Sequence, residues 1–201
     1  MEPVMGRTKP AEQRRADLLA ASEELFLDKG VAATSVEDIT ARAGVSKGLF
    51  YLYFDSKDDL LVAMQNQFSV RLADTIRAAI DLAGDWPAKL DACVLAIFDS
   101  YEASHDLHEV VFHHGGHVSS SHQASSHALV PGVIGDLFAE GRAAGAFDVE
   151  DPEATAVLCF ASTHGFGPGS HTERGPADAR LIRAAQQLFR RAAGVAAGPP
   201  K

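Results

Sequence analysis

Apolar residues recur every three or four positions along almost the whole of this 201-residue chain, which is the spacing that gathers them on one face of an α-helix. The longest such stripe consists of Leu60, Leu61, Met64, Phe68, Leu72, Ile76 and Ile80. The alternation typical of strands is scarce, and the sequence contains no Asn-Gly or Asp-Gly hairpin signal. The sequence therefore predicts an all-α protein of about nine helices.

The first 57 residues differ from the remainder in charge and in helix length. Residues 1–57 carry 8 basic and 9 acidic side chains, whereas residues 58–201 carry 10 and 18. The spacing predicts a helix over 11–29, two short helices over about 35–43 and 46–54, and a long helix that starts near Lys57. Further along, it predicts a short helix around 107–114 and a helix from Leu129 to about Ala144, whose start Pro131 leaves in doubt. The glycine-rich segment 165–169 is expected to end or kink the next helix, and Pro176 to open the last one. We therefore expect a small N-terminal domain over 1–57 and a larger helical domain over 58–201.

Two short helices separated by a glycine turn and followed by a longer helix are typical of a helix-turn-helix. Gly44 supplies the turn, and Thr34 or Ser35 can cap the first short helix. In the second short helix, Phe50 and Phe54 lie four apart and can fill a small core, which leaves the other face for DNA. The candidate DNA contacts are side chains or helix starts that can bond phosphates or base edges, together with one glycine that permits close approach. They are Thr34, Ser35, Ser46, Lys47, Gly48, Tyr51, Tyr53 and Lys57.

The segment from Thr34 to Leu60 resembles the DNA-binding domain of the tetracycline-repressor (TetR) family of bacterial transcriptional regulators. The resemblance rests on Thr34, Ile39, Ala43, Gly44, Val45, Ser46, Gly48, Tyr51, Tyr53, Phe54, Ser56, Lys57 and Leu60. It implies a three-helix DNA-binding domain and a larger effector and dimerisation domain. Leu52 stands where many members carry an aromatic residue that faces DNA.

The resemblance further implies a homodimer that binds a palindromic operator and is released from it by a small-molecule effector. The last two helices are the candidate dimer surface, where they would form a four-helix bundle with their mates. Residues expected there include Leu158, Ala185, Leu188 and Phe189. The alternative is that these apolar stripes only complete the chain's own core; the sequence alone does not separate the two, and the resemblance favours the dimer. The candidate effector pocket combines aromatic walls with imidazoles and consists of Phe98, Tyr101, His105, Phe112, Leu137, Phe160 and His164.

A histidine cluster leaves a metal-sensing regulator of the same fold as an alternative. Seven of the nine histidines fall between His105 and His127, and imidazole is a common ligand of zinc, copper and nickel. Their spacing defines no ligand set, so solvated histidines are the favoured interpretation and neither a metal nor another cofactor is expected.

A metal-dependent enzyme is the remaining alternative. His108-Glu109 resembles the start of the zinc-peptidase motif, but the next histidine, His113, lies five residues on instead of four and so leaves the shared helix face. Neither a nucleophile elbow nor a phosphate loop occurs in the sequence, so no enzyme is expected. The chain has two cysteines, no apolar run of about 20 residues and a polar N-terminus, from which we expect a cytoplasmic protein without a membrane span.

Overall fold

The computed structural model describes residues 10–113, 120–164 and 179–195, with the backbone alone at 113, 120–127 and 164. Within these ranges the chain forms nine α-helices and one π-helical turn, and it contains no strand. The elements are α1 (Ala11–Ala33), α2 (Val36–Ala43), α3 (Lys47–Tyr53), α4 (Lys57–Leu82), α5 (Trp86–Ala103), α6 (His105–His108), η1 (Glu109–His113), α7 (Ser120–Ala143), α8 (Pro152–His164) and α9 (Ala179–Ala192). The all-α prediction is therefore confirmed.

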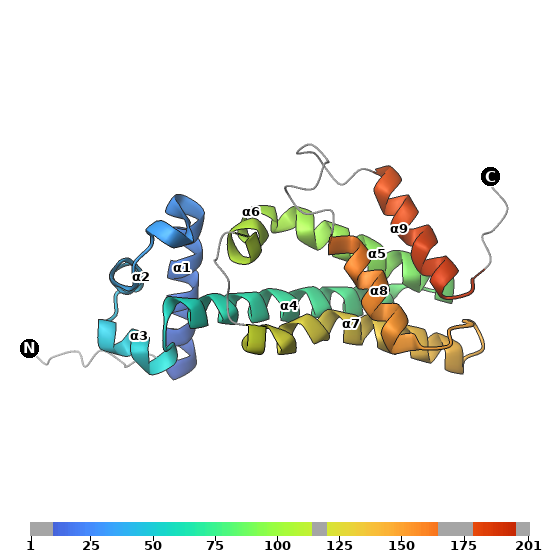
Figure 1. Cartoon of the computed structure of the whole chain (residues 1–201), viewed down its shortest axis with the longest axis horizontal. Helices are drawn as coiled ribbons and strands as arrows, with labels where there is room; N and C mark the ends of the chain where they lie inside the picture. Colours follow the sequence, from blue (N-terminus) through green and yellow to red (C-terminus); the bar gives the residue numbers. More distant parts are fainter. Residues whose placement is uncertain (1–9, 114–119, 165–178, 196–201) are drawn as a thin grey trace, which may run out of the picture.

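The helices gather into a head and a body that are joined by α4. Helices α1, α2 and α3 surround the beginning of α4, and α4 then extends away from them between α5 and α7 (Figure 1). Helix α8 packs against α7, and α9 packs against α5 and α8. No helix in the described ranges is both long enough and apolar enough to cross a membrane.

Two separate groups of buried side chains hold the head and the body together. The head core centres on Phe26, Ile39, Phe50 and Leu60, and the body core on Ile76, Ile97, Ile134, Phe138 and Phe189. Helix α4 contributes to both cores, since its residues up to Met64 belong to the head core and those from Phe68 onward to the body core. The division of the chain after residue 57 stays a prediction.

Three local expectations need correction. The helix expected to begin near Leu129 begins at Ser120 and continues through Pro131, because buried residues on both sides of the proline hold the segment against α4 and α8. The short helix expected near 107–114 is a four-residue α-helix followed by a π-helical turn. Two residues expected at the dimer surface, Ala185 and Phe189, are 6% and 0% exposed because they fill the chain's own body core. The glycine-rich segment 165–169 and residues 176–178 lie outside the described ranges.

Candidate nucleic-acid interface

Helix α2 begins with a reciprocal capping arrangement at Ser35. The Ser35 hydroxyl accepts a hydrogen bond from the Asp38 N–H at 3.1 Å, and the Asp38 carboxylate accepts one from the Ser35 N–H at 2.8 Å. Lys29 donates to the same carboxylate at 2.8 Å, and this bond and those from Ser35 hold the pKa of Asp38 well below its usual value. Ser35, instead of Thr34, is therefore the N-cap, and α2 is tied to α1.

The turn between α2 and α3 depends on Gly44, whose φ of 67° lies in the left-handed region that favours glycine. Ser46 then caps α3, because its hydroxyl accepts a hydrogen bond from the Leu49 N–H at 3.3 Å. Phe50 and Phe54 are 0% and 2% exposed, and their ring centroids lie 5.7 Å apart in the head core. The predicted anchoring face of this helix is thus present.

The opposite side of α3 faces away from the core and is formed by Lys47, Gly48, Tyr51 and Leu52, which we call the α3 face. The side chain of Lys47 is 53% exposed, and Tyr51 and Leu52 are 50% and 72% exposed. A methyl group at Gly48 would meet only the Ser46 hydroxyl, at 4.0 Å, so neither packing nor backbone conformation within the described chain requires glycine there. The sequence predicted three of the four members, and Leu52 was not among the candidate contacts.

The ammonium of Lys47 forms an ion pair with the Glu37 carboxylate of α2. This hydrogen bond is the main reason that the pKa of Glu37 is lowered and that of Lys47 is raised. Glu37 is not among the contacts predicted from the sequence, because residues ten apart meet here only through the angle that the Gly44 turn sets between two helices.

Three other predicted contacts point into the head. Thr34 is 1% exposed, and its hydroxyl donates to the Gly30 carbonyl at 2.8 Å. The Lys57 ammonium donates to the carbonyl oxygens of Val31 and Thr34 at 2.6 and 2.8 Å, so it caps the end of α1. Tyr53 is half-buried against the head core. In this structure the eight candidates therefore do not form one surface, since Lys47, Gly48 and Tyr51 share the α3 face and Ser35 and Ser46 mark helix starts.

Five of the seven predicted effector residues belong to the body core or pack against it. Phe98, Leu137 and Phe160 are buried in the body core, and His105 is exposed with its Nδ1 3.1 Å from a carboxylate oxygen of Asp106. The side chain of His164 lies outside the described part.

Tyr101 and Phe112, by contrast, belong to a group of four rings with Phe68 and His108, which we call the aromatic cluster. Within it the His108 ring centroid lies 5.0 Å from that of Tyr101 and 4.6 Å from that of Phe112. The Phe68 centroid lies 5.4–6.2 Å from the other three. Burial in this cluster raises the pKa of Tyr101.

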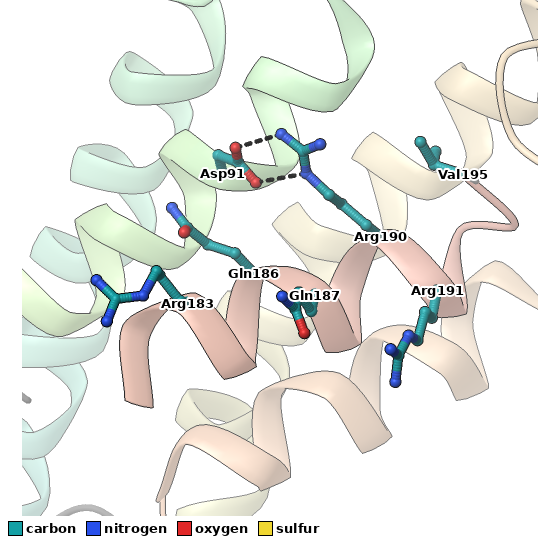
Figure 2. A pocket seen from close by; sticks show the side chains of 7 residues that line it. All are labelled: Asp91, Arg183, Gln186, Gln187, Arg190, Arg191 and Val195. Carbon is teal, nitrogen blue, oxygen red and sulfur yellow. Dashed lines mark hydrogen bonds and ion pairs between the residues drawn. The ribbon is translucent and has the colours of Figure 1, made fainter. Parts of the chain in front are cut away.

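Surface hollows lined by described residues border the body. One, of about 250 Å³, lies between α5 and α9, and Figure 2 shows Arg190 extended across it to Asp91, with nitrogen–oxygen distances of 2.5 and 2.8 Å. None of the predicted pocket residues lines it. Another, of about 370 Å³, lies between α4 and α5 and includes Phe68 of the aromatic cluster among its lining residues. Among the described side chains no three His, Cys, Asp or Glu residues are grouped to hold a metal, but most of the histidine cluster lies outside them.

Comparisons with known proteins bear on both the head and the whole chain. Residues 18–64 match the model of bacterial regulatory proteins of the tetR family. The transcriptional activator FasR of Mycolicibacterium smegmatis is 35% identical over 107 residues, which are 53% of this chain and 49% of that protein. The transcriptional repressor KstR2 of Rhodococcus jostii is 32% identical over 103 residues, or 51% of this chain and 50% of that protein. The chain thus spans about half the length of these curated relatives.

The structural likeness extends beyond the head. A crystal structure of a tetR-family bacterial regulatory protein from Rhodococcus RHA1 superposes with a TM-score of 0.63 and 26% identity, and it covers 88% of this chain and 97% of that one. The match therefore includes the body helices as well as the helix-turn-helix. Residues 18–64 thus match the tetR family of bacterial regulatory proteins, and the fold of the described chain is similar to that of a solved member of this family.

Proposed function

We propose that this protein is a transcriptional regulator whose α3 enters the major groove of an operator. The observation that carries the proposal is the division of α3 into two faces. Phe50 and Phe54 anchor one face, while a cation, a glycine and a phenol remain exposed on the other. Lysine can bind phosphate or a guanine edge, the Tyr51 hydroxyl can bind phosphate, and the exposed Leu52 can contact a thymine methyl. Ser35 and Ser46 cap the N-termini of α2 and α3 beside this face, and the main-chain N–H groups at a helix N-terminus can donate hydrogen bonds to phosphate.

We propose further that the protein acts as a homodimer through α8 and α9. Val157, Leu158 and Leu188 are 50%, 72% and 44% exposed, which leaves an apolar surface on the isolated chain. A two-fold dimer presents two α3 helices to half-sites about 34–36 Å apart, which matches a palindromic operator. The acidic body, with 10 basic and 18 acidic residues over 58–201, then lies away from the phosphates, in a protein that we expect in the cytoplasm.

Repression by occupancy, with release by a small molecule, is the mechanism that we propose for this dimer. A ligand releases the operator if it binds one arrangement of the two heads better than another. The aromatic cluster and the hollow between α4 and α5 are the described features that suit a partly apolar effector. Of the pocket candidates, Tyr101 and Phe112 belong to this cluster, and Phe98, Leu137 and Phe160 are buried in the body core. His105 and His164 complete the candidate set.

A gel-shift titration at two salt concentrations tests the DNA-binding proposal. The probe is a duplex that the wild-type protein selects from a random-sequence pool. We expect Lys47→Ala and Tyr51→Ala to weaken binding. Because Lys47 carries a charge, its loss from each protomer should also reduce the slope of log affinity against log salt by about two per dimer. Val70→Ala, which truncates an exposed α4 side chain, is the control. Unchanged affinity and slope in both α3 variants would contradict the proposal.

A further inference from the structure

The ion pair between Lys47 and Glu37 joins the first turns of the two helices of the helix-turn-helix. Lys47 is the first residue of α3, and Glu37 is the second residue of α2. Both side chains lie in solvent, with 53% and 63% of their surfaces exposed. In the unbound protein the Glu37 carboxylate therefore binds the same Lys47 ammonium that, in the proposed function, contacts DNA.

Each partner has an electrostatic disadvantage at its position if DNA binding is the task. A cation at the start of a helix opposes the helix dipole, so Lys47 does not stabilise α3 by itself. A carboxylate beside the α3 face repels the phosphates of an approaching duplex. In the unbound protein the two side chains neutralise each other, and the lowered pKa of Glu37 shows that its charged form is favoured there.

Two other ion pairs between described residues of the head have a different geometry. Lys29 and Arg42 pair with Asp38 and Glu24 at 2.8 and 2.7 Å, and both pairs connect α1 with α2. They hold the head together and include no residue of the α3 face. The pair of Lys47 with Glu37, by contrast, contains a residue of that face, so the carboxylate and an acceptor on DNA would compete for the same ammonium.

We propose that Glu37 is a specificity-determining residue, because it competes with DNA for the Lys47 ammonium and thereby weakens binding to duplexes of unrelated sequence. On such a duplex, Lys47 would exchange the Glu37 carboxylate for a phosphate and leave Glu37 unpaired beside the DNA. The exchange therefore adds little to the free energy of binding. On an operator, the base contacts of the α3 face hold the helix in the groove, and acceptors on the DNA replace the carboxylate. The inference rests on the proposed DNA-binding function.

The test uses a random-sequence duplex of about 30 base pairs, so no operator needs to be known. Fluorescence anisotropy across a salt series compares the full-length wild type with Glu37→Gln, Lys47→Ala and the double variant. We expect Glu37→Gln to bind the random duplex about tenfold more tightly at low salt, with a slope steeper by about two per dimer. In the Lys47→Ala background the gain from Glu37→Gln should be clearly smaller, because only the repulsion between the carboxylate and the phosphates is then removed, and the preference for a selected operator over random DNA should fall in Glu37→Gln.

The control variant is Asp74→Asn, which opens the exposed Arg77–Asp74 pair of α4 and changes the net charge equally. It should leave random-duplex binding within about twofold of wild type, since the change lies outside the head. Thermal melting checks that Glu37→Gln remains folded, and Glu37→Ala serves as a second variant if it does not.

The outcomes separate this inference from the proposed function. An equal gain with and without Lys47 would mean that Glu37 acts by general repulsion, and the competition would be refuted. If Lys47→Ala weakens binding but Glu37→Gln and Glu37→Ala leave it unchanged, the inference fails while DNA binding stands. If the wild type binds neither selected nor random DNA, both fail.

Discussion

Replacing Gly48 by alanine separates the stability of the head from its proposed contact with DNA. The new methyl group would meet only the Ser46 hydroxyl, at 4.0 Å, and Gly48 has no positive φ. Alanine in a helix is favoured over glycine by up to about 1 kcal/mol. For a chain of this length, that gain raises the melting temperature by about 2–4 °C at most.

The same methyl group should weaken binding to an operator. If Gly48 lies against the wall of the groove, the methyl group occupies space that the duplex needs, and such overpacking costs about 1 kcal/mol or more at each site. A dimer contains two copies of α3, so the loss is about 2 kcal/mol, or about 30-fold in affinity. Gly48→Ala is therefore expected to be more stable and yet a weaker DNA binder.

Gly132→Ala is the matched control. Gly132 is also an exposed helical glycine, and a methyl group added to it would meet nothing within 4 Å, but it lies in α7 of the body. Differential scanning calorimetry and anisotropy on a selected duplex measure the two effects, and the control should show the gain in melting temperature without the loss of affinity. Equal DNA affinities for both variants would refute the placement of Gly48 at the groove.

Three further predictions test other parts of the structure. Lys57→Met removes charged hydrogen bonds to the end of α1, so unfolding should become easier by about 2 kcal/mol and the melting temperature should fall by about 4–8 °C. Unchanged melting with weaker DNA binding would instead indicate a phosphate contact. Leu158→Asp should convert the dimer to a folded monomer in sedimentation velocity, since this side chain is 72% exposed on the proposed dimer surface, and a persistent dimer would place the interface elsewhere. Burial raises the pKa of Cys93 to about 12 and of Cys159 to about 11, so iodoacetamide at pH 8 should label neither thiol until guanidinium unfolds the chain, and rapid labelling of the native protein would contradict their burial.

The features that the sequence predicts well are those set by neighbours along the chain. The two faces of α3 follow from the spacing of Phe50 and Phe54, and the turn follows from Gly44. Lys57 and Thr34 were expected to contact phosphate because each stands near a helix start. Their partners are main-chain oxygens at the end of α1, and a side-chain pattern contains no information about which carbonyls remain free in three dimensions.

The body shows a second limit of sequence reasoning. Helix α9 carries apolar residues on more than one side, and the sequence alone does not distinguish the side that covers the chain's own core from the side left for a partner. Phe189 belongs to the first and the 44% exposed Leu188 to the second. Pro131 likewise suggested a helix boundary, because a proline removes one main-chain hydrogen bond of a helix. The helix continues through it, since packing against α4 and α8, which are distant in the sequence, outweighs that loss.

The junction between head and body contains contacts that connect the body to the head core. Val111 of η1 is 1% exposed within the head core, and Gln65 of α4 donates to its carbonyl at 3.0 Å. The next residue, Phe112, packs against both cores and stacks on His108 in the aromatic cluster. A π-helical turn is rare and often marks a functional position. A ligand that displaces Phe112 would therefore also move Val111 against the head, whereas one bound between α5 and α9 would have to act through the body core and along α4. This difference in path is the physical reason for seeking the proposed effector beside the aromatic cluster first.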